Sequence, residues 1–318
     1  MEKFAHDLPF DPRYGCDLEA LLKVPAPEGT PADFEAFWRD TYEETRSVPT
    51  NVVARPSNAK ISGYRVVDVE YDSLGGFRVG GWALWPETGD ASVGLICGHG
   101  YGGRDAPEAP ILPRAAAIFP CGRGFNRSAA PGYPDNAAAH VIFGINDKNT
   151  YSHRGCVADL WQAATVLSEL VPSSARRLLY AGASFGGGLG AMMLPWDDRI
   201  ERGFLDVPSF GNHPLRVTLQ CNGSGAAVKC RYENVPSILQ TLAYFDAATA
   251  SMFNSKPTLV APALFDPAVP PPGQFAVYNA LAGDKEIFVR EAGHHAWSGE
   301  ARESVLTQRA ARAFLEGC

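Results

Sequence analysis

The sequence predicts an α/β fold in which helices cover both faces of a mostly parallel central sheet. Short apolar runs typical of buried strands alternate with segments of helical periodicity from residue 92 to residue 315. Neither an internal repeat nor a low-complexity linker interrupts this alternation. We therefore expect one domain over residues 1–318, with residues 1–60 as an N-terminal extension that packs on the core.

The first expected elements are a helix and a β-hairpin. Thr30 and Pro31 have the residue types of a helix cap and a first helical position, and aromatic residues follow at helical spacing over residues 34–42. Apolar and polar residues alternate over 67–71, and a second apolar stretch over 77–85 follows a pair of glycines, Gly75-Gly76. This pattern predicts two strands joined by a tight turn.

The alternation of strands and helices fills the rest of the chain. Further strands are expected over residues 92–97, 115–119, 177–181, 203–207, 258–265 and 286–290, and further helices over 155–170, 186–194, 274–281 and 300–315. These strands are short and apolar on both faces, which is typical of strands buried between two helical layers. They are therefore expected to form the central sheet.

Composition narrows the classes of function. Apolar residues make up 46% and charged residues 20% of the chain, which is ordinary for a globular protein. The net charge is −7 and no block of Lys and Arg occurs, so we expect no nucleic-acid partner. No stretch approaches 18 apolar residues, so no membrane span is expected. The first residues, MEKFAHDLPFDPRYG, lack the basic and apolar regions of a signal peptide, which favours a cytoplasmic location.

The cysteines do not indicate a metal or redox centre. All seven are scattered along the chain and none has C-x-x-C spacing. Most are expected to be small buried residues. Cys221 and Cys230 lie nine residues apart around a glycine-rich turn and could form a disulfide, although disulfides are rare in cytosolic chains.

The strongest local motif is Gly182-Ala183-Ser184-Phe185-Gly186, which lies between an expected strand and a helix of small residues. A strand, a G-x-S-x-G turn and a helix form the nucleophile elbow of α/β-hydrolases. The turn is so tight that residues two before and two after the serine must be glycine, and the helix N-terminus favours developing negative charge. The alternative is a glycine-rich crossing that binds phosphate or only packs closely.

A nucleophilic serine requires a base and an acid that orients the base, and in α/β-hydrolases these follow in the order Ser, Asp, His. Asp266 ends the expected strand over 258–265, and a histidine pair follows the last strand. Asp206 is the rival acid, but it follows Ser184 too soon, so we interpret it as structural. Glycine before His294 would let the loop bend sharply, which favours His294 over His295 as the base.

Several segments together resemble carbohydrate esterase family seven, the acetyl xylan esterase and cephalosporin C deacetylase family, over nearly the whole chain. The matching segments are Phe34-Glu35-Ala36-Phe37-Trp38, the loop Gly98-His99-Gly100-Tyr101-Gly102-Gly103, the elbow through Gly188, Leu205-Asp206-Val207-Pro208, residues 241–246, and the loop from Asp266 to Asn279. The resemblance implies an α/β-hydrolase fold and a serine esterase that deacetylates sugars or similar small molecules, with no metal and no organic cofactor.

The resemblance also implies roles for particular residues. The triad would be Ser184, Asp266 and one histidine of the pair, and gap-free spacing from Asp266 favours His295, so both histidines stay open. The backbone N–H groups of Tyr101 and Phe185 would form the oxyanion hole. His99 would orient this loop through hydrogen bonds rather than act as a base.

The resemblance further implies a homo-oligomer whose active sites face an internal chamber. The hairpin around Gly75-Gly76 could contribute to contacts between copies. Trp82 and Trp85 need burial, either in such contacts or in the core of a single chain.

Three departures from the family pattern surround the expected site. Phe125 follows Arg123-Gly124 and Phe185 follows the serine, where the family has glutamine, and Ala296 follows the histidine pair instead of a His-Glu ending. If both rings face the pocket, they narrow it and favour small acyl groups; Phe125 could equally be a packing change. A peptidase or carbon–carbon hydrolase would keep the same triad, whereas a non-catalytic binding protein would have lost it.

Overall fold

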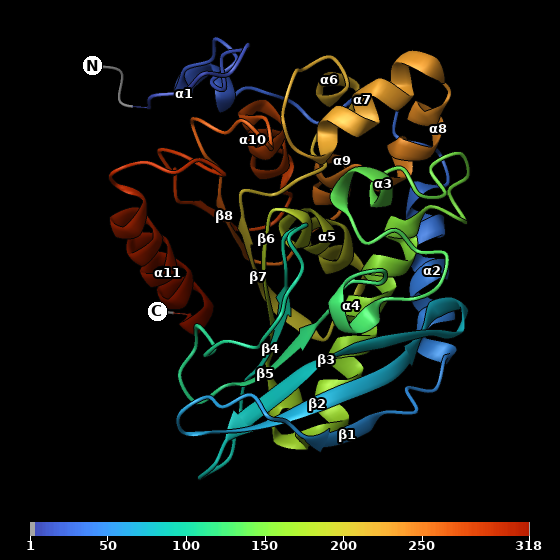
Figure 1. The fold of residues 1–318 in the computed structure, drawn as a ribbon, viewed down its shortest axis with the longest axis vertical. Coiled ribbons are helices and arrows are strands. Elements are labelled where there is room, and N and C mark those ends of the chain that lie inside the picture. Colours follow the sequence, from blue (N-terminus) through green and yellow to red (C-terminus); the bar gives the residue numbers. More distant parts are fainter. Residues whose placement is uncertain (1–3, 318) are drawn as a thin grey trace.

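One twisted sheet of nine strands organises the computed structural model, which describes residues 4–317 (Figure 1). The strand order is β1-β2-β3-β5-β4-β6-β7-β8-β9. The strands are β1 (Val53–Pro56), β2 (Tyr64–Ser73), β3 (Phe77–Pro86), β4 (Gly94–Gly98), β5 (Ala116–Pro120), β6 (Leu178–Ala183), β7 (Ile200–Asp206), β8 (Thr258–Ala261) and β9 (Lys285–Ile287). Strands β1, β2, β3 and β5 pair antiparallel, and β5, β4, β6, β7, β8 and β9 pair parallel. The predicted mostly parallel sheet is confirmed.

Eleven α-helices are assigned within residues 4–317. They are α1 (Leu18–Leu21), α2 (Phe34–Ser47), α3 (Ala137–His140), α4 (Ser152–Leu170), α5 (Phe185–Met193), α6 (His213–Arg216), α7 (Ser224–Asn234), α8 (Ile238–Leu242), α9 (Ala247–Ser251), α10 (Pro271–Ala280) and α11 (Glu300–Glu316). Helices α4 and α5 pack on one face of the sheet, and α11 packs on β7 and β8 from the other face (Figure 1). The prediction that helices cover both faces is confirmed.

The predicted hairpin is present as β2 and β3. Ser73 pairs with Phe77, and Gly75 and Gly76 between them have φ values of 72° and 71°. Glycine adopts these left-handed angles without steric cost, which lets the two strands reverse within a few residues. On β3, Trp82 is only 4% exposed and lies under the Arg127 guanidinium, 4.6 Å from the ring centre. The burial of Trp82 is therefore complete within the single chain.

The start of α2 differs from the expectation. The helix begins at Phe34 with Asp33 in the cap position, because the Phe34 N–H donates to the Pro31 carbonyl in a turn that precedes the helix. The Asp33 side chain makes no cap hydrogen bond; it accepts from Lys148 (2.7 Å) and from the Tyr244 hydroxyl. Thr30 and Pro31 therefore lie outside the helix that they were predicted to start.

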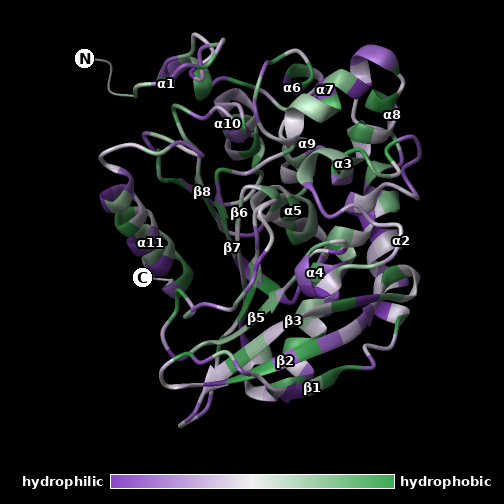
Figure 2. Ribbon diagram, viewed as in Figure 1, coloured by the Kyte–Doolittle hydropathy of each residue, from purple (hydrophilic) through white to green (hydrophobic). Residues whose placement is uncertain are grey.

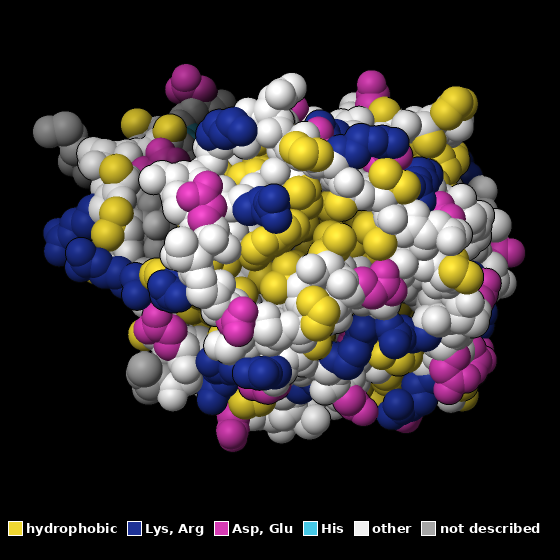
Figure 3. Space-filling model, turned by 90° about the horizontal axis from the view of Figure 1, so that it is seen from below, with side chains coloured by type: hydrophobic (Ala, Val, Ile, Leu, Met, Phe, Trp, Pro, Cys, Tyr) yellow, Lys and Arg dark blue, Asp and Glu magenta, His cyan; other side chains and the backbone are white. Residues whose placement is uncertain are grey.

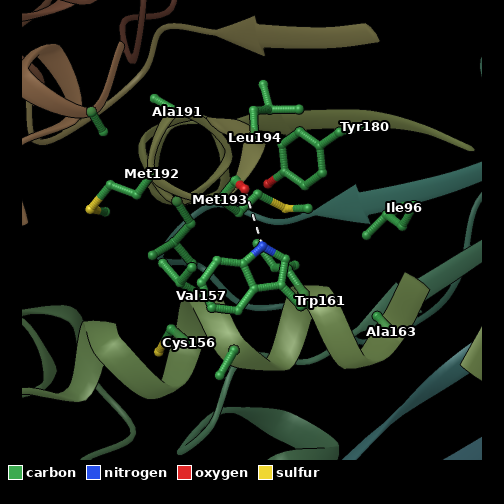
Figure 4. Packing of buried hydrophobic residues seen from close by; sticks show 14 of the residues in the cluster. Ile96, Cys156, Val157, Trp161, Ala163, Tyr180, Ala191, Met192, Met193 and Leu194 are labelled. Atoms are coloured by element: carbon green, nitrogen blue, oxygen red, sulfur yellow. Dashed lines mark hydrogen bonds between the residues drawn. The ribbon is translucent and has the colours of Figure 1, made fainter. Parts of the chain in front are cut away.

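The core beside the elbow is built from α4 and α5 (Figure 4). Trp161 of α4 is fully buried, and its indole N–H donates to the Met193 carbonyl at the end of α5, at 3.1 Å. Trp38 of α2 packs edge-on against Trp161 at 6.1 Å between ring centres. All nine residues of α5 are buried. These contacts fix the position of the helix that follows Ser184, since interiors packed at this density resist displacement.

Helix α11 shows how the outer layer differs from this core. Its buried residues recur about once per turn (Glu303, Thr307, Ala311, Phe314, Leu315), and the helix carries mixed hydrophilic and hydrophobic colours in Figure 2. This spacing is that of a surface helix with one buried stripe. On the face seen in Figure 3, acidic and basic side chains are interspersed around a central group of apolar side chains, without a large area of one sign.

Candidate active site

Ser184 lies on a tight turn between β6 and α5. Its φ of 54° and ψ of −112° are unusual for a residue with a side chain. A Cβ at Gly182 would lie 2.7 Å from the backbone of Gly186, and a Cβ at Gly186 would lie 2.7 Å from the backbone of Gly98. Both motif glycines are therefore required by close backbone approach, as the sequence argument expected. The Ser184 N–H donates to the Asp206 carbonyl at 2.8 Å, which holds the turn against β7.

His294 lies between Ser184 and Asp266. Its Nε2 is 2.9 Å from Ser184 Oγ, and its Nδ1 is 2.7 Å from Asp266 Oδ2. A carboxylate can only accept, so Nδ1 carries the proton and Nε2 is free to accept from the serine hydroxyl. Burial lowers the pKa of His294, but the hydrogen bond and the charge of Asp266 outweigh it and hold the pKa above its ordinary value.

The Asp266 carboxylate is held from several sides. It is fully buried, and its Oδ1 accepts from the backbone N–H groups of Ala268 and Val269, each at 2.9 Å. Its Oδ2 accepts from Gln274 Nε2 at 2.9 Å as well as from His294. These bonds fix the orientation of the carboxylate and so that of the imidazole. Gln274, at the first turn of α10, is a positioning residue that the sequence analysis did not identify.

The two histidines of the pair point in different directions. His295 packs against the rings of Phe265, at 4.9 Å, and Phe4, at 6.4 Å, instead of contacting Ser184. Gly293, which precedes the pair, was expected to let the loop bend sharply, but the structure gives it a different role. The left-handed φ of 46° belongs to His294 itself, and a Cβ on Gly293 would lie 2.4 Å from Asp266 Oδ2. Gly293 is therefore needed for the close approach of the loop to the carboxylate.

Asp206 does not contact the imidazole. Its carboxylate accepts two hydrogen bonds from Arg290, at 2.9 and 3.0 Å. Burial raises the pKa of Asp206, and the charge of Arg290 opposes this rise. The side chain joins the end of β7 to the segment after β9, so the interpretation of Asp206 as structural agrees with the geometry.

The loop after β4 brings backbone amides to the serine. A Cβ on Gly100 would lie 3.7 Å from Ser184 Cβ, so this loop passes directly beside the turn. Within residues 4–317, the backbone N–H groups of Tyr101 and Phe185 donate to no protein acceptor. Both are therefore available to a developing negative charge at Ser184.

His99 fixes this loop, as expected. Its Nε2 accepts from the Gly122 N–H at 2.7 Å, so Nδ1 carries the proton and donates to the Gly100 carbonyl at 2.6 Å. Burial lowers the pKa of His99 to about 4, which keeps the ring neutral near pH 7. His99 thus acts on the backbone conformation.

The side chains of Phe125 and Phe185 face the core. They are 3% and 1% exposed, and Phe185 stacks on the Tyr101 ring at 4.1 Å between centres. The condition for a narrowed pocket is therefore not met, because α5 directs Phe185 inward and the loop after β5 places Phe125 against His140 at 4.7 Å. The alternative of a packing change fits Phe125. The two replacements enlarge an aromatic cluster beneath the site.

Three fully buried histidines extend this cluster. Tyr101 Oη lies 2.9 Å from His153 Nε2, and the Nε2 atoms of His140 and His213 contact the carbonyls of Arg123 (3.0 Å) and Phe245 (3.1 Å). Each of the three Nδ1 atoms has no hydrogen-bond partner among the described residues. Burial lowers the pKa of His140 to about 4 and that of His213 to about 3. The sequence analysis did not identify this cluster. The only feature of the sequence that indicates it is the presence of histidines within otherwise apolar segments.

A segment from near the start of the described chain supports the two loops of the site. The Asp266 N–H donates to the Pro12 carbonyl at 3.2 Å. Phe4 stacks on Phe265 at 4.7 Å and packs edge-on against Trp297 at 5.3 Å. Residues 4–12 therefore contact the segments on both sides of the Asp266–His294 hydrogen bond.

The disulfide expectation is wrong. Cys221 and Cys230 are both free thiols, the first buried and the second exposed on α7, so the glycine-rich turn does not bring them together. Over residues 4–317, no group of three or more His, Cys, Asp or Glu side chains is arranged to hold a metal ion. In the same range, no helix is long and apolar enough to cross a bilayer.

The parallel sheet, the serine turn and the Ser184–His294–Asp266 contacts define an α/β-hydrolase. The chain belongs to the acetyl xylan esterase family, whose sequence pattern matches residues 14–309, so the family expected from the sequence is confirmed. Acetyl esterase Axe7A of Xylanibacter ruminicola is 19% identical over 300 residues. That match covers 87% of this chain and 66% of the relative, so the chain spans just under two thirds of that protein.

Solved structures with the same fold include two acetyl xylan esterases. The enzyme from Paenibacillus sp. R4 has a TM-score of 0.79 at 22% identity, with 93% of this chain and 99% of that chain covered. Acetyl xylan esterase 1 from Thermoanaerobacterium sp. JW/SL YS485 has a TM-score of 0.78 at 20% identity, covering 94% and 98%. Pyrococcus horikoshii acylaminoacyl peptidase is more distant, with a TM-score of 0.60 at 16% identity over 81% of this chain and 41% of that chain.

Proposed function

We propose that the protein is a serine esterase that removes acetyl groups from sugars or similar small molecules through an acyl-enzyme. The observation that carries this proposal is the position of His294, which is within hydrogen-bond distance of both Ser184 Oγ and Asp266 Oδ2. A general base must lie about 2.6–3.2 Å from the group it deprotonates. The acetyl group follows from membership of the acetyl xylan esterase family.

In the first half of the proposed reaction, His294 Nε2 takes the Ser184 proton while Oγ attacks the ester carbonyl carbon. The carbonyl oxygen becomes negative and accepts from the N–H groups of Tyr101 and Phe185, donors that are typically worth about 3 kcal/mol each. Asp266 stabilises the imidazolium and keeps its Nδ1 proton in place. His294 then returns the proton to the leaving alcohol.

In the second half, water attacks the acetyl-enzyme. His294 accepts a proton from this water, and the same two amides hold the second oxyanion. Collapse of the intermediate releases acetate and returns the proton to Ser184 Oγ. Each proton thus moves between the substrate, water, Ser184 and His294. The groups of this chain that take part in these steps are side chains and backbone amides.

The test is hydrolysis of p-nitrophenyl acetate, with a peptide and a β-diketone as competing substrate classes. We expect release of p-nitrophenol and covalent labelling of Ser184 by an organophosphonate. Peptide or carbon–carbon cleavage without ester hydrolysis would contradict the proposal, as would failure to label Ser184. A screen of acetylated sugars would then identify the alcohol. Acetyl esters should exceed butyryl and octanoyl esters in kcat/KM.

We also propose a homo-oligomer, on the resemblance to carbohydrate esterase family seven. The apolar group in the middle of the face in Figure 3 is compatible with a contact between copies. Trp82 does not support the proposal, since it is buried within one chain. Light scattering should give a multiple of 34.2 kDa at micromolar concentration, and a mass near 34.2 kDa would contradict the proposal.

A further inference from the structure

The segment of residues 98–103, at the end of β4, carries Tyr101, whose N–H is one of the two proposed oxyanion donors. Glycine occupies four of its six positions, and glycine leaves the backbone free to adopt many conformations. One backbone hydrogen bond ties the segment to the elbow, from the Gly186 N–H to the His99 carbonyl at 2.8 Å. The orientation of the Tyr101 N–H therefore depends largely on the two side chains of the segment, those of His99 and Tyr101.

These two side chains hold the same peptide unit from opposite ends. The unit that carries the Tyr101 N–H also carries the Gly100 carbonyl, which accepts from His99 Nδ1 at 2.6 Å. At the other end, the Tyr101 hydroxyl lies 2.9 Å from His153 Nε2. Because the ring of Tyr101 is rigid, fixing its hydroxyl limits how far the Tyr101 backbone can rotate.

His153 is a fixed partner for this hydroxyl. It lies in the first turn of α4, is fully buried and packs against the rings of Tyr151, at 4.4 Å, and Phe210, at 4.5 Å. Burial lowers the pKa of His153 well below its ordinary value, so the ring is neutral. Side chains packed in this way in a protein interior have little room to move.

The Tyr101 hydroxyl is the donor in this hydrogen bond. Among residues 4–317, neither the hydroxyl nor the His153 ring has another hydrogen-bond partner. A proton on Nδ1 leaves one buried N–H unpaired, whereas a proton on Nε2 would leave both the hydroxyl proton and Nδ1 unpaired. The first arrangement costs less, so Nε2 accepts from Tyr101.

The ring of Tyr101 also joins the two oxyanion donors to each other. It stacks on the ring of Phe185 at 4.1 Å between centres and 22° between planes, and Phe185 supplies the second N–H. Phe185 is 1% exposed and begins α5, whose residues are all buried. Donors that are fixed in place before the reaction stabilise an oxyanion far better than donors that must reorient.

We propose that His153 is a positioning residue for the oxyanion hole, which it orders by accepting a hydrogen bond from the Tyr101 hydroxyl. This inference rests on the proposed esterase function. His153 touches neither the substrate nor the reacting atoms, and its effect on the reaction is carried by the orientation of the Tyr101 N–H.

The experiment is a double-mutant cycle on p-nitrophenyl acetate hydrolysis. Tyr101→Phe removes the donor and keeps the stacked ring, and His153→Leu removes the acceptor with little change in volume. The double variant lacks both. His153→Gln is the conservative variant, because its side-chain carbonyl can accept from the Tyr101 hydroxyl. For each protein, kcat and KM are determined separately, and the Tm is recorded.

Each single variant should lose at least about tenfold in kcat, part of the loss expected for a whole oxyanion donor, with KM within about twofold. The double variant should lose no more than either single variant, because both remove the same hydrogen bond. His153→Gln should recover part of the lost kcat. Losses that multiply in the double variant, or a kcat within about twofold of the wild type in either single variant, would overturn the proposal.

Two control variants remove similar groups elsewhere in the core. His213→Leu removes a fully buried histidine that contacts the Phe245 carbonyl at 3.1 Å and has no hydrogen bond or ring contact with Tyr101. Tyr71→Phe removes a fully buried hydroxyl that donates to the Asp159 carbonyl at 3.0 Å. Both should lower the Tm and keep the wild-type kcat. A loss of kcat in these controls equal to that in the test variants would mean that the effect is one of general stability.

Covalent labelling separates this inference from the esterase proposal. The rate at which an organophosphonate labels Ser184 also depends on the oxyanion hole, because its phosphoryl oxygen gains negative charge there. If the wild type is labelled but hydrolyses no ester, the esterase proposal fails and the labelling rates of the same variants decide the role of His153. A wild type that is not labelled would overturn both.

The test does not depend on the stability of His153→Leu. If that variant does not fold, Tyr101→Phe decides, since it removes a single oxygen atom and leaves the stacked ring in place. Labelling and hydrolysis by Tyr101→Phe at wild-type rates would then overturn the proposal.

Discussion

His294 and the buried histidines beneath it are the same residue type in opposite environments. His294 has a partly exposed side chain and a carboxylate partner, and its pKa lies above the ordinary value. His99 and His140 are buried without a carboxylate, and burial lowers the pKa of each to about 4. The contrast shows that a carboxylate partner outweighs burial at one site, whereas burial alone keeps the others neutral.

The largest expected effect tests whether Ser184, which lies beside the partly exposed His294, is the reactive group. Ser184→Ala should lower kcat on p-nitrophenyl acetate about a millionfold, as loss of a triad nucleophile typically does. The Tm should stay close to that of the wild type, because the Ser184 side chain is not part of the packed core. Activity near that of the wild type would mean that the serine turn is not the reactive site.

A loss of kcat nearly as large is expected from His294→Ala but not from His295→Ala. His294→Ala should lose about 10⁵-fold or more in kcat, since the base and nucleophile act as a unit. His295→Ala should stay within about tenfold, because the ring packs on Phe265 and does not contact Ser184. The two single variants are assayed on one acetyl ester. A dead His295→Ala with an active His294→Ala would reverse the assignment.

The carboxylate partner is tested by Asp266→Asn. An amide would let His294 adopt the wrong tautomer, so kcat should fall about 10⁴-fold. The base must be neutral, so wild-type kcat/KM should rise with pH through the raised pKa of His294, above the ordinary histidine value. In Asp266→Asn this rise should move to lower pH. A rise at the same pH in both proteins would show that Asp266 does not set the pKa.

The smallest expected effect is on stability and arises from the buried histidines. Their folded pKa values are below the unfolded value, so the unfolded state binds more protons as the pH falls from about 6.5 to about 4. Each could cost up to about 3 kcal/mol by pH 4. His294 has the opposite sign: its contribution is present at low pH and is lost as the pH rises through its folded pKa.

Thermal unfolding from pH 7 to pH 4.5 measures this effect. The Tm should fall as the pH decreases, and it should fall less steeply in His140→Gln, which cannot take up the extra proton. His295→Gln is a matched control, because His295 lies in a loop outside the buried cluster and should keep the wild-type slope. A flat Tm over this range would show that the buried rings titrate normally.

Local signals in the sequence predict the parts of the site that depend on backbone geometry. Residue types at fixed spacing predict the elbow around Ser184 and the hairpin at Gly75-Gly76. The spacing of Asp206 from Ser184 likewise predicts that Asp206 is structural. The helices α6 to α9 between β7 and β8 were not predicted. Helices α6, α8 and α9 have only four or five residues, and segments this brief depend on tertiary packing. Helix α7 has 11 residues but buries only two of them, so it carries little apolar periodicity. The inward direction of Phe185 likewise depends on which face of α5 meets the Tyr101 loop.

Partners that come from distant segments could not be predicted. Gln274 and Gly293 meet at the Asp266 carboxylate only after α10 and the histidine loop have folded against it. The disulfide expectation failed for the same reason, since spacing along the chain says nothing about the direction of two side chains.

The support that residues 4–12 give to the Asp266 and His294 loops has a consequence for the order of events in folding. The Pro12–Asp266 hydrogen bond and the Phe4–Phe265 stack join segments far apart in the sequence. Contacts at large sequence separation are slow to form, because closing a long loop costs entropy before any contact is gained. A refolding chain should therefore recover its sheet before it recovers the ability to react with an ester.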